Sequence, residues 1–304
     1  MTHLQFSIIV PVYNRFELLE ETIKSLTNQT YGDIEIILVD DGSSTSVADF
    51  LKGKNIDSRI SIIRLNVNSG ESAAVNQGWV HAKNRFRAIV NSDDPQEPTW
   101  LAQMSTAILA NPEFGFFYPD RKVIDAKGAV IRAEPLHDWS KKLAYKKLIM
   151  IASAGLVIDS SKLPVDFLPR DENIRYPSDL EQMFRLIEYV NGYHVRGVYG
   201  VWREHSNSAT SATNSISQFQ DFEKYLLQWI LRNEFILKKY TNIRFCYAYL
   251  YAQGWLILRA KLTVKESIIV LSKSRFKYTL TQYPSVCIYL LQISAINAGR
   301  KFLN

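Results

Sequence analysis

"DIEIILVDDGSS" (residues 33–44) is an apolar run of strand length that ends in two carboxylates, a glycine and two serines. Three further runs have the same form: FSIIVPVYN (6–14), RISIIRLNVN (59–68) and FRAIVNSDD (86–94). Helical patterns alternate with these strands, at 16–29, 72–83 and 98–112. Continuous apolar strands that alternate with helices predict an α/β fold with a mostly parallel, Rossmann-like sheet covered by helices on both faces.

Polar residues follow three of the four strands. They are Tyr13-Asn14, then Asp40 to Ser43, then Asn91 to Asp94. The carboxyl ends of parallel strands meet at one edge, where ligands bind in folds of this class. Asp93 and Asp94 are adjacent like charges, which repel unless water, a cation or hydrogen-bond donors screen them. One such end is typical of a solvated turn, but three at one edge favour a binding site.

The middle of the chain is less regular. The sequence predicts a strand within 153–161 and a helix over 177–193, with Ser178 or Asp179 as its N-cap. A strand-like stretch follows at 194–211, and a run rich in Ser, Asn and Thr at 206–217 marks a boundary or loop. We therefore expect one domain over 1–213 and a separate C-terminal region over 214–304.

Composition is typical of a folded globular protein, with 47% apolar and 22% charged residues among 304. The net charge of +6 is uneven: residues 215–304 carry 13 Lys and Arg against 4 Asp and Glu, and the remainder carries 23 against 26. Two cysteines imply no disulfide framework, and the start MTHLQFS has no signal-peptide features. These features favour a cytoplasmic protein.

The C-terminal region is rich in aromatic and basic residues at helical spacing, in 222–240, 248–262 and 283–303. A helical subdomain packed on the first domain explains this pattern. Peripheral association with a membrane, through an apolar face and a basic rim, explains it too. Both remain open, whereas nucleic-acid binding is disfavoured because no recognition motif is present.

Six motifs occur along the chain in this order: IIVPVYN, ILVDDGSS, SGESAAVNQG, VNSDDPQEP, PSDLEQMFRL and VWREH. Together they resemble the inverting glycosyltransferases of family 2, which have the GT-A fold, over residues 5–210. The resemblance implies transfer of a sugar from a nucleotide-diphosphate donor, typically a UDP-sugar, to a hydroxyl of a glycan or lipid-linked acceptor. It also implies a Mg²⁺ or Mn²⁺ cofactor, a role in cell-envelope polysaccharide biosynthesis, and a cytoplasmic location that peripheral contact with the inner face of the membrane would fit.

The resemblance assigns roles to matching residues. The donor-binding set is Pro11, Val12, Tyr13, Asn14, Asp40, Asp41, Asn91, Ser92, Asp93 and Arg203. Within it, 11–14 would hold the base and ribose, and Asp40 and Asp41 would contact the base. The metal on the diphosphate would be held by Asp93, Asp94 and His205, and Asp179 would be the general base.

The chemistry is consistent with these residue types. A divalent cation held by carboxylates and phosphates stabilises a leaving diphosphate, and the sequence has no Cys/His cluster of the kind that binds zinc. One carboxylate suffices as general base for a single inverting displacement.

Two positions depart from the family pattern. Asn91 replaces the first Asp of the DxD motif, and Ser178 replaces the usual Glu before Asp179. A non-catalytic nucleotide-sugar-binding or scaffolding module on the same fold is therefore the alternative hypothesis. A dinucleotide-dependent oxidoreductase is disfavoured because no Gly-x-Gly-x-x-Gly follows the first strand.

Overall fold

The computed structural model of the chain describes residues 3–141, 144, 154–174, 178–205 and 232. The chain divides into two units, one formed by Met1–Lys141 with Met150–Ser211 and the other by Lys142–Ile149 with Ala212–Asn304. All described residues except Ala144 and Arg232 lie in the first unit. The predicted stretch 206–217 and, apart from Arg232, the predicted C-terminal region 214–304 lie outside the described residues, so the boundary at 213/214 stays a prediction.

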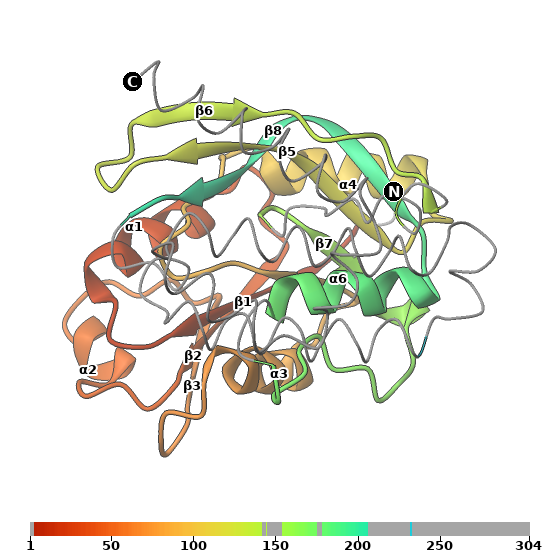
Figure 1. The fold of residues 1–304 in the computed structure, drawn as a ribbon. Coiled ribbons are helices and arrows are strands. Elements are labelled where there is room, and N and C mark those ends of the chain that lie inside the picture. The colour runs from red at the N-terminus through yellow and green to blue at the C-terminus, as the bar shows by residue number, and fades with distance from the viewer. Residues whose placement is uncertain (1–2, 142–143, 145–153, 175–177, 206–231, 233–304) are drawn as a thin grey trace, which may run out of the picture. The chain divides into compact units, whose positions relative to one another are not determined.

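Eight strands form one sheet (Figure 1). Its parallel half contains, in spatial order, β3 (Ile60–Arg64), β2 (Ile34–Asp40), β1 (Phe6–Val12) and β4 (Phe86–Ile89). In this register Val12 pairs with Asp40, and Asp40 pairs with Arg64. The carboxyl ends of β1 and β2 therefore coincide, which confirms the mostly parallel sheet predicted from the apolar runs.

The other half of the sheet is mixed. It contains β7 (Val157–Asp159), β5 (Phe116–Ile124) and β6 (Val130–Glu134), joined by antiparallel pairing, and β8 (Gly192–Arg203), which pairs with β5 in parallel. The sequence analysis did not predict β5 and β6. The pairing places Arg203, the last residue of β8, beside Ile124 at the end of β5.

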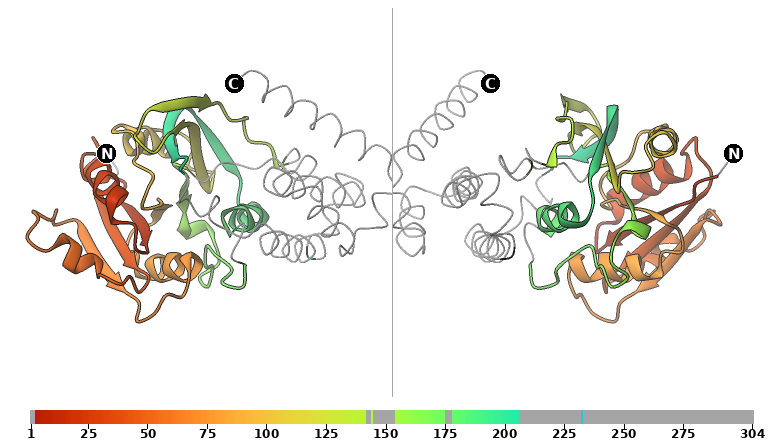
Figure 2. Two further views of the ribbon diagram at one scale, coloured as in Figure 1. Left: turned by 60° about the vertical axis from the view of Figure 1, so that its left-hand side comes forward. Right: turned by 90° about the vertical axis from the view of Figure 1, so that its right-hand side faces the viewer.

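Helices cover both faces of the parallel half (Figure 2). They are α1 (Phe16–Thr27), α2 (Val47–Leu51), α3 (Glu71–His81) and α4 (Trp100–Ala110), and a further helix, α6 (Ser178–Tyr189), leads into β8. Side chains of α1 and α4 share a buried cluster with the even-numbered residues of β1, such as Ile8 and Val10. Helix α3 packs on the opposite face, against Ile9 and Val39. The core fixes the orientation of α3, whose first residue lies at the carboxyl edge of the sheet.

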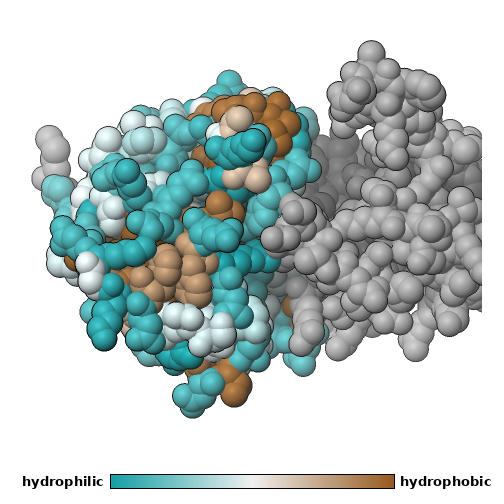
Figure 3. Space-filling view, turned by 90° about the vertical axis from the view of Figure 1, so that its left-hand side faces the viewer, coloured by the Kyte–Doolittle hydropathy of each residue, from teal (hydrophilic) through white to brown (hydrophobic). Residues whose placement is uncertain are grey.

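One face of the molecule is mostly hydrophilic, with hydrophobic side chains in small separate patches (Figure 3). The edge strand β6 exposes Val130 and Ile131. Within 3–141, 154–174 and 178–205, no helix is both long and apolar enough to cross a bilayer. The sequence leaves membrane contact open for residues 214–304, which, apart from Arg232, are outside the described part of the chain.

Replacement of Gly78 by alanine is expected to destabilise the fold. A Cβ atom at Gly78 would lie 2.4 Å from Ile9 Cγ2 and 3.0 Å from Val39 Cγ2, so α3 would be forced away from the sheet. Overpacking outweighs the higher helix propensity of alanine, and we expect a net loss of about 1–2 kcal/mol in the free energy of unfolding. Thermal and urea unfolding measure this loss.

Gly32→Ala is the matched control, because a Cβ atom there meets nothing within 4 Å. A Gly78→Ala variant as stable as Gly32→Ala would contradict the close approach of α3 to β1 and β2.

Candidate active site

Asp40 holds the loop that follows β2. It is fully buried, and its carboxylate accepts hydrogen bonds from the backbone N–H of Ser43 at 2.8 Å, the backbone N–H of Val47 at 3.0 Å, and the guanidinium of Arg64. Burial opposes ionisation, but these donors together lower the pKa of Asp40 below its ordinary value. The sequence predicts contact with a base, whereas the structure directs both oxygens of Asp40 to protein donors.

Asp41 holds a second loop, the one that leads into α3. Its carboxylate accepts hydrogen bonds from the backbone N–H groups of Ser69 at 2.7 Å and Gly70 at 2.9 Å. Burial raises the pKa of Asp41. The two adjacent carboxylates of DDGSS therefore fix two different loops at the carboxyl edge, and contact of Asp41 with a nucleotide stays a prediction.

The loop 11–14 is tied to DDGSS. Asn14 has a left-handed backbone, with φ of 51°, and its side-chain oxygen accepts hydrogen bonds from the backbone N–H and the hydroxyl of Ser44, both at 2.9 Å. Pro11 and Val12 are buried, whereas Tyr13 is 44% exposed. An exposed tyrosine at this edge offers a surface on which a base can stack.

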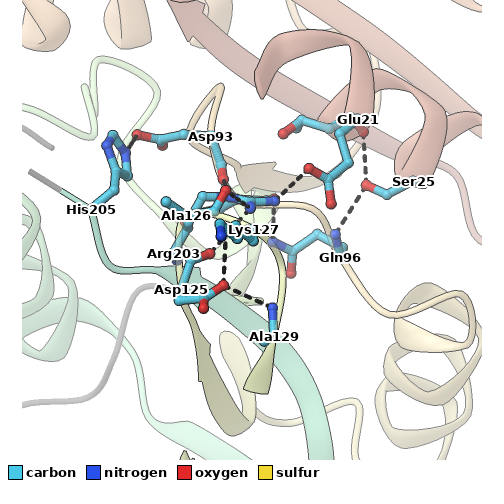
Figure 4. Close-up of polar contacts among 12 residues, drawn as sticks. Glu21, Ser25, Asp93, Gln96, Asp125, Ala126, Lys127, Ala129, Arg203 and His205 are labelled. Atoms are coloured by element: carbon cyan, nitrogen blue, oxygen red, sulfur yellow. Dashed lines mark hydrogen bonds and ion pairs between the residues drawn. The ribbon is translucent and has the colours of Figure 1, made fainter. Parts of the chain in front are cut away.

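Asp93 is the focus of the acidic loop after β4. It is buried, and its Oδ2 atom lies 3.1 Å from Arg15 Nη1 and 2.9 Å from His205 Nε2 (Figure 4). Arg15 follows β1 and His205 follows β8, so three segments meet at one carboxylate oxygen. Two of the three predicted metal ligands, Asp93 and His205, are therefore brought together.

Asp94 has a different environment. Its Oδ1 atom accepts a hydrogen bond from the backbone N–H of Arg203 at 2.7 Å, and its Oδ2 atom accepts one from the side-chain amide of Asn91 at 2.8 Å. Burial and the neighbouring Asp93 charge raise the pKa of Asp94. Asp94 thus links the β4 loop to the end of β8, and its predicted role as a metal ligand stays a prediction. Ser92 is also buried.

The Arg203 side chain is 1% exposed and points into the protein (Figure 4). Its guanidinium donates hydrogen bonds to the carbonyl oxygens of Asp93, Asp125 and Ala126 and to the Glu21 carboxylate, at 2.6–3.2 Å. Arg203 thus holds the backbone beside Asp93, and its predicted role in donor binding stays a prediction.

Asp179 lies at the start of α6, and its side chain is exposed. Glu71, the first residue of α3, connects it with the rest of the site. Desolvation raises the pKa of Glu71, the nearby Arg170 charge lowers it, and the charges of Asp179 and Asp93 raise it further. Asp93 and Asp179 thus both act on one carboxylate, which brings the predicted metal loop and the predicted base to the same region.

Sequence reasoning missed Arg15, Glu71 and Arg170. Arg15 directly follows PVYN, and Glu71 lies inside SGESAAVNQG, so their positions in or next to these motifs could have marked them as site residues. Nothing in the sequence marks Arg170, whose Nη2 atom lies 3.6 Å from Glu71 Oε1. Asn76 joins α3 to the same segment, because it hydrogen-bonds the backbone of Arg170 and the Glu172 carboxylate.

Across the part of the chain that the structure describes, no group of three or more His, Cys, Asp and Glu side chains has the arrangement of a metal site. Asp93 and His205 supply two ligands at most. This number suits Mg²⁺ or Mn²⁺, which are commonly bound by one or two protein groups together with the phosphates of a substrate. The residues present therefore fit a cation that arrives with a diphosphate.

The sequence match agrees with this geometry. Residues 7–153 match the family described as glycosyl transferase family 2. The O-antigen biosynthesis protein RfbC of Myxococcus xanthus is 32% identical over 142 residues, which are 45% of this chain and 11% of RfbC. The putative teichuronic acid biosynthesis glycosyltransferase TuaG of Bacillus subtilis is 37% identical over 89 residues, which are 29% of this chain and 35% of TuaG. The matches thus span only about a third or less of these relatives.

Solved structures share the fold. S. aureus TarS 1–349 in complex with UDP-GlcNAc superposes with a TM-score of 0.64 at 14% identity, covering 97% of this chain and 92% of that one. The mannosyltransferase PcManGT from Pyrobaculum calidifontis, in complex with GDP-Man and Mn²⁺, superposes with a TM-score of 0.58 at 14% identity, covering 100% and 88%. The fold is that of the GT-A glycosyltransferases, and the match over residues 7–153 supports membership of glycosyltransferase family 2.

Replacement of Arg203 by lysine is expected to destabilise the protein. One ammonium group cannot reach the four acceptors that the guanidinium joins. We expect a loss of about 3 kcal/mol in the free energy of unfolding, measured by urea denaturation.

Arg196→Lys is the control, because Arg196 lies on the same strand with its side chain 78% exposed and should change stability little. Equal losses in the two variants would contradict the role assigned to the Arg203 contacts.

Proposed function

We propose that this chain is an inverting glycosyltransferase that transfers a sugar from a nucleotide-diphosphate donor, a UDP-sugar, to a hydroxyl of a glycan or lipid-linked acceptor. The observation that carries the proposal is the convergence at the carboxyl edge of the sheet. There Asp93 lies between Arg15 and His205, and its charge acts on Glu71 together with that of Asp179. Diphosphate departure and hydroxyl deprotonation need such groups within one site.

On this proposal the nucleotide lies over the ends of β1 and β2. Tyr13 stacks on the base, and the backbone of Pro11 and Val12 lines the same pocket. Asp40 and Asp41 lie beside the base, and their carboxylates hold the two loops that border it, at 43–47 and 69–70. Structures of the same fold bound to UDP and UDP-GlcNAc support a uridine donor, although another holds GDP-Man.

The cation would be held by Asp93 and His205, with Asp94 and Arg203 fixing the loop that carries Asp93. When bound, a divalent cation stabilises negative charge on the leaving diphosphate. A ligand set that combines a carboxylate with an imidazole suits Mn²⁺ better than Mg²⁺. Arg15, 3.1 Å from Asp93, adds a second positive charge on the same side.

Asp179 would accept the proton of the attacking hydroxyl. It lies at the start of α6, whose buried face includes Met183, Phe184 and Ile187, so a packed helix positions the carboxylate. A single displacement from the face opposite the diphosphate inverts the anomeric carbon. The names of RfbC and TuaG, which refer to O-antigen and teichuronic acid biosynthesis, support a cell-envelope glycan as the acceptor.

Turnover is expected to depend on a divalent cation. Treatment with EDTA should abolish release of UDP from a UDP-sugar, and Mn²⁺ should restore it. Asp93→Asn should need a higher Mn²⁺ concentration than wild type, because it removes a charged ligand. Activity that EDTA leaves unchanged would contradict the metal-assisted mechanism.

Asp179→Asn should separate binding from chemistry. Loss of a general base reduces turnover by about 10²–10⁴-fold, while donor affinity measured by calorimetry should stay within about twofold of wild type. Asp166→Asn is the control, since Asp166 is an exposed carboxylate in the segment before α6. Metal-dependent UDP binding by wild type without turnover on any acceptor would favour the non-catalytic alternative that Asn91 and Ser178 suggest.

A further inference from the structure

Arg170 is a buried cation whose hydrogen bonds are incomplete. Its residue is 4% exposed, and within the described part of the chain its Nε and Nη1 atoms have no hydrogen-bond partner. Burial of an unpaired charged donor costs free energy, so such a group needs an explanation in a ligand or in function. The anionic group next to it is Glu71, with Nη2 and Oε1 3.6 Å apart.

Helix α3 contains Glu71 and holds the backbone of Arg170. Asn76 donates to the Arg170 carbonyl at 3.0 Å and accepts from the Arg170 N–H at 3.0 Å, and Ser72 donates to the Ile174 carbonyl. Glu71 belongs to the same helix, whose position the close packing of Gly78 on the sheet determines. The backbone at Arg170 and the backbone at Glu71 are therefore held in a fixed relation.

Glu71 remains open to a ligand. Its side chain is 42% exposed, and the separation of 3.6 Å from Arg170 Nη2 is too long for a direct hydrogen bond, so Arg170 faces the carboxylate as an ion pair without capturing its oxygens. A hydroxyl group suits this carboxylate, because an O–H donates to a carboxylate oxygen. Gly70, the residue before Glu71, donates its backbone N–H to Asp41 at 2.9 Å, so Glu71 lies at the same edge of the sheet as the loops predicted to bind the donor. In the proposed reaction the donor sugar lies between the groups that hold its diphosphate and the group that deprotonates the acceptor.

We propose that Glu71, oriented by Arg170, binds a ring hydroxyl of the transferred sugar and so helps determine which nucleotide sugar the chain accepts. This inference rests on the proposed function, since it assigns a residue to the sugar half of the donor site. Glu71 is the residue that contacts the ligand, and Arg170 is a positioning residue. The ligand class is a neutral hexose with free hydroxyls.

The test compares a nucleotide with its sugar conjugates. Calorimetric titrations of the full chain with Mn²⁺ use UDP, UDP-glucose, UDP-galactose, UDP-GlcNAc and GDP-mannose as probes. In Glu71→Gln, affinity for the accepted UDP-sugar should fall about 10-fold or more, which is the loss expected for a hydrogen bond to a charged group, while affinity for UDP stays unchanged. Glu113→Gln, an exposed glutamate before β5, is the control.

A donor series sharpens the assignment. Among analogues of the accepted donor that each lack one ring hydroxyl, one should bind wild type as weakly as Glu71→Gln binds the complete donor. That analogue should lose nothing further in Glu71→Gln, because the two changes remove the same contact. Arg170→Lys should weaken sugar binding in wild type and have a smaller effect in the Glu71→Gln background, whereas a purely structural role would make the two losses add.

The possible failures are distinguishable. A wild-type chain that binds none of the nucleotide sugars overturns the proposed function and this inference with it. A wild-type chain that binds a UDP-sugar, with Glu71→Gln binding it equally well, overturns only the inference. Equal loss of UDP and UDP-sugar affinity in Glu71→Gln also overturns it, because the residue would then act on the nucleotide or on the fold.

Discussion

The buried guanidinium of Arg203 is the contact on which the site depends. It joins the backbone beside Asp93, the turn after β5 and the Glu21 carboxylate of α1, while its own backbone N–H holds Asp94. These contacts join the mixed half of the sheet to the parallel half at the carboxyl edge. Because β8 ends at Arg203 and His205 follows two residues later, the same contact determines where the imidazole meets Asp93.

Charge balance is the second constraint. The charges of Asp93 and Asp179 raise the pKa of Glu71, and Arg15 and Arg170 are cations beside Asp93 and Glu71. A cluster of carboxylates at one sheet edge is unfavourable unless cations or donors compensate it. On the proposed function, a divalent ion provides the remaining compensation when the donor binds. The loops at this edge do not need the ion to hold their conformation, since the carboxylates of Asp40 and Asp41 accept hydrogen bonds from the backbone N–H groups of these loops.

Prediction from the sequence succeeded where the pattern was local. The four parallel strands are continuous apolar runs, α1 and α4 lie within their predicted ranges, and α3 begins one residue before its predicted range of 72–83. Prediction failed for β5 and β6. Pro119 and charged residues interrupt the apolar pattern of β5, and every residue of β6 except the last is exposed, so neither carries the signature of a buried strand. Pairing between segments that are distant in the chain stabilises both strands, and a short stretch of sequence does not reveal that pairing.

The sequence by itself determined the family, the parallel half of the sheet, and the set of carboxylates that reaches its carboxyl edge. Only the tertiary structure decided what each carboxylate does there. Asp40 and Asp94 give both oxygens to protein donors, Asp93 meets Arg15 and His205, and Glu71 meets Arg170. Motif spacing specifies which side chains share an edge. The direction of a hydrogen bond depends on donors supplied by segments far away in the chain, and these donors come together only when the core has fixed β8, α3 and the loop before α6.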